Sequence, residues 1–314
     1  MGDIRRALRR HLPVLLISAA TGIMGFTGDR FILYLASLFM IFAVFASSYN
    51  MVFGYLKHVS FGHSLFYAAG AYGVALLTTR LVPDMLLGIL FGIALATSLA
   101  LAVGALTLRH SSIYFAMLTL AFAMLFYSLL LKWRDFTGGS DGISGIPRSS
   151  YFFTLPAIED YYRLLFVFFL ASMLLLNWID GSKFGLLLKA LGDNEDRFKF
   201  TGLSIYRYKL SGFVVSGFFS GLAGSFYALL MRSVTPEIAY WTTAAEPLIM
   251  VLLGGAQYFL GPSVGAFIFV LITTLTARLA EYWQLFMGVV LVALLLGARG
   301  GILNLVERLW GRRF

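Results

Sequence analysis

Residues 31–50, FILYLASLFMIFAVFASSYN, are twenty consecutive positions without Asp, Glu, Lys or Arg. A helix needs about 20 predominantly apolar residues to cross the hydrocarbon core of a bilayer. This stretch therefore predicts a transmembrane helix.

Nine further runs of the chain also lack these four charged residue types; they lie near 12–28, 62–79, 85–107, 111–131, 164–179, 210–231, 247–260, 262–277 and 284–298. The first run follows several arginines, as in a signal peptide, but no clean small-residue cleavage site comes after it. We interpret it as the first helix. The sequence thus predicts an all-α polytopic membrane protein of about ten spans, with residues 1–314 forming a single transmembrane domain.

The composition supports this class and excludes others. Sixty per cent of the residues are apolar and only 12% are charged, against about a quarter charged in soluble domains, and the mean hydropathy is +0.85. The absence of cysteine excludes disulfides and thiolate metal sites. The net charge of +9 fits basic cytoplasmic loops better than nucleic-acid binding.

The chain contains no sequence motif for catalysis, metal binding or nucleotide binding. Neither a phosphate-binding Gly-x-x-x-x-Gly-Lys-Ser/Thr segment nor a His-Glu-x-x-His zinc motif occurs. The ten runs contain no Asp, Glu, Lys or Arg, whereas a proton-coupled carrier needs a titrating group within the bilayer. Sodium coupling, which carbonyls and hydroxyls can serve, stays open. We predict no catalytic residue, metal or cofactor in this chain.

The distribution of basic residues predicts the orientation. Ten spans with a cytoplasmic N-terminus place 16 Lys and Arg inside and 8 outside, as the positive-inside rule requires. Both termini are then cytoplasmic. The long loop at 180–209, which starts as an amphipathic helix, is cytoplasmic, and the turn-rich loop at 132–163 lies outside.

Two patterns of small residues predict special helix geometry. Gly and Ala recur at every fourth position from Gly88 to Gly104, and Gly, Ser and Ala do so from Gly212 to Ala228, which predicts close packing of helix backbones. Residues 54–64 and 254–263 are each glycine-rich breaks before a small-residue helix, and such pairs indicate broken helices around a solute. The predicted topology places both breaks on the cytoplasmic side. An inverted repeat would place them on opposite sides of the membrane.

Several ordered segments resemble LivM-type permeases of the branched-chain amino acid ABC importer family. The segments lie between about 45 and 270. They are SYNMVFGY at 48–55, VSFGHS at 59–64, GAY at 70–72, IYFAMLTLA at 113–121, TGGSDGI at 137–143, YKL at 208–210, SG at 216–217, GLAG at 221–224, LGG at 253–255 and GPSVGA at 261–266. Two departures stand out: Lys57 and His58 replace small or uncharged polar residues, and 194–200 is unusually aromatic.

The resemblance implies one permease subunit of a heteromeric importer in the bacterial inner membrane. Its partners would be a LivH-like permease, two cytoplasmic ATP-binding subunits that hold ATP and Mg²⁺, and a periplasmic solute-binding protein. It also implies that the 180–209 loop docks into the ATPase through a coupling segment, formed by Ala190, Leu191, Gly192, Asp193, Asn194, Glu195, Asp196 and Arg197.

Six residues are predicted to line or frame the substrate path: Gly54, Gly62, His63, Ser64, Thr119 and Glu246. Non-helical backbone at membrane depth is tolerated only where it is buried in protein or faces a watery cavity. The apolar residues nearby, Phe61, Phe66, Tyr114 and Phe115, suit a leucine-like side chain. We therefore expect import of branched-chain or other hydrophobic amino acids. Import of urea or short amides, and a sodium-coupled carrier or channel acting alone, remain alternatives.

Overall fold

The computed structural model describes residues 14, 17–19, 21–25, 28–110, 112–151, 154–275, 285, 288, 289, 292 and 300–310. The long helices are α2 (Arg30–Asn50), α4 (Met85–Thr107), α5 (Ser112–Lys132), α7 (Ile158–Asp180) and α10 (Ile205–Met231). The shorter ones are α3 (His63–Leu76), α8 (Lys183–Asp193), α9 (Glu195–Lys199), α11 (Trp241–Gly254), α12 (Gly261–Leu275) and α14 (Ile302–Trp310).

Short elements link these helices. Two are π-helical, η1 (Met51–Tyr55) and η2 (Leu77–Leu81), and continue α2 and α3 without a gap. The others are α6 (Arg134–Thr137), the 3₁₀ turns η3 (Gly139–Asp141) and η4 (Pro236–Ala239), and the strands β1 (Ile143–Ser144) and β2 (Ser233–Val234).

Five helices of the described chain are long and apolar enough to cross a membrane: Arg30–Tyr55, Met85–Thr107, Ser112–Lys132, Ile158–Asp180 and Ile205–Met231. This confirms the predicted all-helical membrane class. The predicted count of about ten spans is not established, because α11 and α12 are shorter. The predicted run at 12–28 is described only at residues 14, 17–19, 21–25 and 28, and the run at 284–298 falls mostly outside the described residues.

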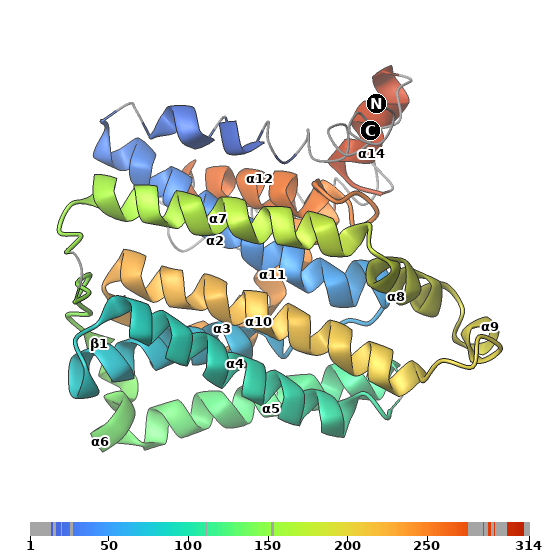
Figure 1. The fold of residues 1–314 in the computed structure, drawn as a ribbon, viewed down its shortest axis with the longest axis horizontal. Helices are drawn as coiled ribbons and strands as arrows, with labels where there is room; N and C mark the ends of the chain where they lie inside the picture. The colour runs from blue at the N-terminus through green and yellow to red at the C-terminus, as the bar shows by residue number, and fades with distance from the viewer. Residues whose placement is uncertain are drawn as a thin grey trace.

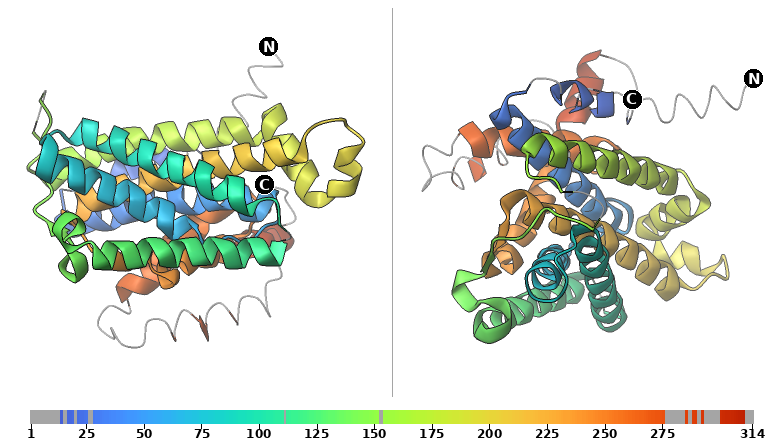
Figure 2. Two further views of the ribbon diagram at one scale, coloured as in Figure 1. Left: turned by 90° about the horizontal axis from the view of Figure 1, so that it is seen from below. Right: turned by 60° about the vertical axis from the view of Figure 1, so that its left-hand side comes forward.

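The helices form one bundle with two distinct ends. In Figure 1, α6 and β1 lie at the left end, whereas α8 and α9 lie at the right end. Figures 1 and 2 show α4 and α5 on one side of the bundle and α12 and α14 on the other. At the centre, α10 packs against α2, α3 and α4. We refer below to the α6 end and the α8 end.

Helices α3, α4 and α10 pack backbone to backbone, as the small-residue pattern predicted. A Cβ atom added to Gly70 would lie 2.0 Å from the carbonyl oxygen of Gly221, and one added to Gly92 would lie 2.4 Å from that of Gly70. Ala96 and Ala100 of α4 face Gly221 and Gly217. The absence of side chains at these positions allows the close approach.

Two predicted boundaries are wrong for identifiable reasons. α7 begins at Ile158 and not at 164, because Glu159 and Asp160 form its first turn, where acidic side chains are favourable. The run at 247–260 is not one helix. α11 starts at Trp241, carries Pro247 inside, and ends at Gly254, because Gly255 has a φ of +109° that a helix cannot continue.

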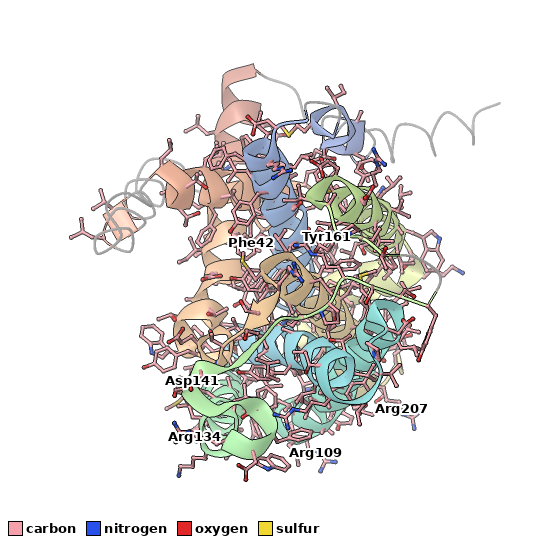
Figure 3. The ribbon with its side chains drawn as sticks, turned by 90° about the vertical axis from the view of Figure 1, so that its left-hand side faces the viewer. Phe42, Arg109, Arg134, Asp141, Tyr161 and Arg207 are labelled. Atoms are coloured by element: carbon pink, nitrogen blue, oxygen red, sulfur yellow. The ribbon has the colours of Figure 1, made fainter. Side chains whose placement is uncertain are left out.

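The predicted outside loop folds into a compact cap at the α6 end. β1 pairs with β2 in antiparallel register, with Ile143 opposite Val234. Gly142 has a φ of +68°, and a Cβ there would lie 2.0 Å from the carbonyl oxygen of Val234, so only glycine fits. Figure 3, which looks onto this end, shows Arg134 and Asp141 close together on the loop.

Asp84 anchors the cap to the start of α4. Its carboxylate accepts hydrogen bonds from Leu87 N at 2.9 Å, from Ser150 Oγ at 2.7 Å and from Tyr151 N at 2.7 Å. Burial alone would raise the pKa of Asp84, but these hydrogen bonds together outweigh burial and lower the pKa. The carboxylate is therefore ionised near neutral pH and joins the cap to the helix.

Candidate coupling and translocation site

The first glycine-rich break lies inside the bundle. After η1 ends at Tyr55, residues 56–62 run without helical structure to α3. His63, the first residue of α3, hydrogen-bonds Ser216 of α10. Ser216 is eleven residues beyond Ile205, the start of α10, or about 16 Å along the helix axis. α3 therefore begins well within the bundle, as predicted for a broken helix.

His63 is the centre of a buried polar network at this break. Its Nδ1 lies 3.1 Å from Ser60 Oγ and its Nε2 lies 2.7 Å from Ser216 Oγ. Ser216 Oγ donates to the carbonyl oxygen of Ser48 at 2.6 Å. Rings of Tyr49, Phe66 and Phe213 surround the imidazole. The His63 side chain is fully buried, so in this conformation it contacts protein on all sides.

Four of the six predicted path residues lie together here. Thr119 Oγ1 of α5 accepts a hydrogen bond from Phe61 N at 3.2 Å, and a Cβ on Gly62 would lie 3.2 Å from Thr119 Cβ. Ser64 Oγ donates to the carbonyl oxygen of Ala239 in η4. Gly62, His63, Ser64 and Thr119 are all buried, so no open route passes them in this conformation.

Gly54, the fifth path residue, packs against the second glycine-rich break. Asn50 Nδ2 donates to the carbonyl oxygen of Ala256 at 3.1 Å, and a Cβ on Gly54 would lie 2.8 Å from the same oxygen. The two breaks therefore lie next to each other in the bundle.

Glu246, the sixth path residue, lies elsewhere on α11. It is half-buried. Within the described part of the chain, no hydrogen bond or ion pair links Glu246 to the His63 network.

The predicted coupling segment lies at the α8 end and contacts the first break. Gly192 of α8 packs against η1 so closely that a Cβ would lie 1.9 Å from the carbonyl oxygen of Tyr55. Tyr55 Oη also donates to Asp180 Oδ1 at 2.5 Å, and Lys189 Nζ approaches the same oxygen at 2.5 Å. The end of α8 is thus fixed directly on the broken end of α2.

The coupling segment also presents an exposed surface. Its exposed residues are Ala190, Asp193, Asn194, Glu195, Asp196 and Arg197, whereas Leu191 is buried and Gly192 is half-buried. The Asn194 side chain caps α9 by accepting from Arg197 N at 2.9 Å, a standard helix start. One side of the segment therefore contacts the bundle, and the other is free to meet a partner.

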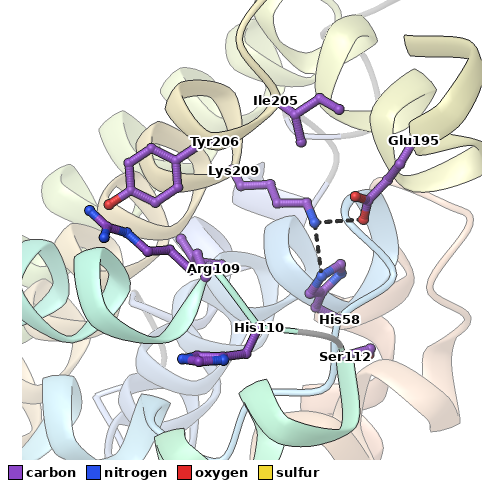
Figure 4. Close-up of a pocket in the computed structure, with 9 residues that line it drawn as sticks. His58, Arg109, His110, Ser112, Glu195, Ile205, Tyr206 and Lys209 are labelled. Atoms are coloured by element: carbon purple, nitrogen blue, oxygen red, sulfur yellow. Dashed lines mark hydrogen bonds and ion pairs between the residues drawn. The ribbon is translucent and has the colours of Figure 1, made fainter. Parts of the chain in front are cut away.

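A charged cavity connects this segment to the break (Figure 4). It has a volume of about 810 Å³ and is lined by His58, Leu108, Arg109, His110, Ser112, Glu195, Ile205, Tyr206 and Lys209. The Lys209 ammonium group forms an ion pair with Glu195 Oε1 at 2.5 Å and lies 3.4 Å from His58 Nε2. The Lys209 side chain is only 8% exposed.

His58 is neutral in this arrangement. Its Nδ1 lies 2.6 Å from the carbonyl oxygen of Leu56 and therefore carries the proton, which leaves Nε2 free to accept from Lys209. Burial lowers the pKa of His58; the hydrogen bond to Leu56 raises it, the Lys209 ammonium lowers it, and the Glu195 carboxylate raises it. The net direction is downward, so the ring is uncharged near neutral pH.

The sequence did not predict a role in the site for Lys209, Ser216, Ser48 or Asn50. The Tyr208-Lys209-Leu210 segment and the unusual Lys57-His58 pair were the available signals for the cavity. The pairing of Lys209 with Glu195 spans 14 positions and a turn, which no helical periodicity reveals.

A bundle of long apolar helices with a broken helix inside it and a partly exposed helix at one end fits a polytopic transport permease. Residues 31–295 match the family model described as "Branched-chain amino acid transport system / permease component". The chain belongs to this family, and it is a multi-pass inner-membrane protein.

Two relatives agree with this assignment. Each is named "High-affinity branched-chain amino acid transport system permease protein LivM"; one is from Escherichia coli (strain K12) and the other from Salmonella typhimurium (strain LT2). They are 29% and 28% identical to this chain over 301 residues, which cover 87% of this chain and 70% of each relative. No solved structure matches the chain.

Proposed function

We propose that this chain is one permease subunit of an ATP-driven importer of branched-chain or other hydrophobic amino acids. Family membership over 31–295 supports the transport class. The observation that carries the mechanism is the contact of Gly192 with the backbone of Tyr55, because it joins an exposed docking segment to a broken helix. Movement of the segment would then change access at the break.

The proposed complex contains a LivH-like permease, two ATP-binding subunits and a periplasmic solute-binding protein. ATP and Mg²⁺ would bind to the ATP-binding subunits, and this chain would carry no cofactor. The exposed residues of α8 and α9 would meet the ATP-binding subunit. The two permeases would alternate between outward and inward access.

The proposed path passes the first break, framed by Gly54, Gly62, His63, Ser64 and Thr119, and includes Glu246 elsewhere on α11. Rings of Phe66, Phe115 and Phe213 pack together next to His63. Contact with an apolar wall stabilises a leucine-like side chain by about 2 kcal/mol, whereas urea has no apolar part to gain from it. This comparison favours a hydrophobic amino acid as cargo.

Uptake by the assembled complex tests the function. Expression with its partner subunits should yield a complex that contains two ATP-binding subunits and takes up leucine into vesicles only with ATP and the binding protein. Sodium-driven uptake by this chain alone would contradict the proposal. Uptake of urea and not leucine would keep the mechanism and change the cargo.

The proposed orientation has both termini and the α8 end in the cytoplasm and the α6 end in the periplasm. The chain has no native thiol, so single cysteines report accessibility cleanly. Ser140 and Lys183 are both exposed, at opposite ends of the bundle. A Ser140→Cys variant should react with a membrane-impermeant reagent added to intact cells, and a Lys183→Cys variant should react only after lysis. The reverse pattern would overturn the topology.

A further inference from the structure

Lys209 is the only described residue that contacts both α9 and the first break through its charged group. Its ammonium group meets Glu195 at one side and His58 at the other, and each partner belongs to a different segment. Glu195 is the first residue of α9, and His58 lies in the non-helical stretch 56–62. Lys209 itself is in the second turn of α10, whose buried side supports the His63 network.

The geometry makes this contact specific. A primary ammonium group has three donors and no acceptor, so it satisfies a carboxylate and an unprotonated imidazole nitrogen together. Because its side chain is buried, water does not replace these partners without cost. Arg109, His110, Ser112 and Tyr206 complete the cavity wall. Arg109 packs over the ring of Tyr206 and is not paired with Glu195.

We propose that Lys209 is a positioning residue that locks the coupling segment to the first break, so that α9 and residues 56–62 move together during transport. This proposal rests on the proposed function. It assigns to one ammonium group the link between docking of the ATP-binding subunit and access of the solute to the break. Lys209 holds the coupling segment at Glu195, whereas the Gly192 contact holds it three residues earlier.

Lys209→Met is the informative variant. Methionine keeps most of the volume of the lysine stem, and Glu195, whose side chain is 44% exposed, stays solvated without its partner, so folding should persist. In the assembled importer, the ATP hydrolysed per leucine imported should rise about tenfold, a typical size for coupling between sites. Lys209→Arg, which keeps the cation, should restore most of the coupling.

A second measurement is independent of cargo. Hydrogen exchange in the purified complex should quicken in 56–62 and in 195–199 together when Lys209 becomes methionine. The matched control is Lys199→Met, because Lys199 forms an ion pair of similar length with Asp196, at 2.6 Å, but both side chains are exposed. The control should change neither the exchange of 56–62 nor the coupling ratio.

The proposal would be overturned if residues 56–62 exchanged at the wild-type rate in the Lys209→Met variant. It would also be overturned if Lys199→Met quickened their exchange as much as Lys209→Met does. If the wild-type complex imports no leucine, the proposed function fails. The exchange comparison then still decides whether Lys209 links the two segments.

Discussion

Gly192→Leu is expected to reduce ATP-driven leucine uptake by the assembled complex at least tenfold while ATP hydrolysis continues. A Cβ at this position would lie 1.9 Å from the Tyr55 carbonyl oxygen and 2.9 Å from the Tyr55 carbonyl carbon. These are backbone atoms, which cannot turn aside as a flexible side chain can. The end of α8 must therefore move away from η1, and overpacking of this kind typically costs about 1–3 kcal/mol.

The distinguishing measurement is the ratio of ATP hydrolysed to leucine imported. Loss of both activities together would indicate failed assembly, whereas continued hydrolysis without uptake indicates lost coupling. Lys183→Leu is the matched control, because it places the same side chain at an exposed position of the same helix. Normal coupled uptake by Gly192→Leu would show that the contact with Tyr55 does not transmit motion.

Gly62→Leu is expected to block uptake almost completely while the complex still assembles. Gly62 has a φ of −88°, which any residue adopts, so the effect depends on side-chain volume and not on backbone strain. A Cβ would already lie 3.2 Å from Thr119 Cβ, and the remaining atoms of leucine would occupy the break. The measurement is leucine uptake compared with the amount of intact complex recovered from the membrane.

Gly62→Ala provides the graded control for this prediction. One methyl group requires Thr119 to shift by only a few tenths of an ångström, so uptake should fall partially. Equal, wild-type uptake by both variants would exclude this break as the path. His63→Ala is less informative, because removing a fully buried ring leaves a cavity and deprives Ser60 and Ser216 of a partner, which destabilises the fold as well.

The sequence predicted those features that depend on composition and local pattern. α4 was predicted at 85–107 and extends over Met85–Thr107, because a long apolar run bounded by charged residues leaves little freedom in where a span ends. Small residues at every fourth position likewise predicted that α4 and α10 pack closely, but not which helices they contact. Both signals lie within single helices.

Features that depend on tertiary contacts were beyond the sequence. The charge-free run was predicted from 247, after Glu246, but α11 begins six residues earlier at Trp241. The bundle holds the helix through Pro247 despite the hydrogen bond that proline cannot donate. His63 was predicted only to line or frame the path. Its burial between Ser60 and Ser216 depends on how α10 crosses α3, which no local pattern encodes.

The backbone contacts among α3, α4 and α10 have a mechanical consequence. An interface can switch between two arrangements when its side chains can repack into a second set of rotamers. At Gly70, Gly92 and Gly221 the contacts are between backbones, so these positions offer no rotamers for a second arrangement. We expect them to travel as a rigid body. Alternation of access would then fall to the outer helices, whose aromatic side chains can change partners as they slide.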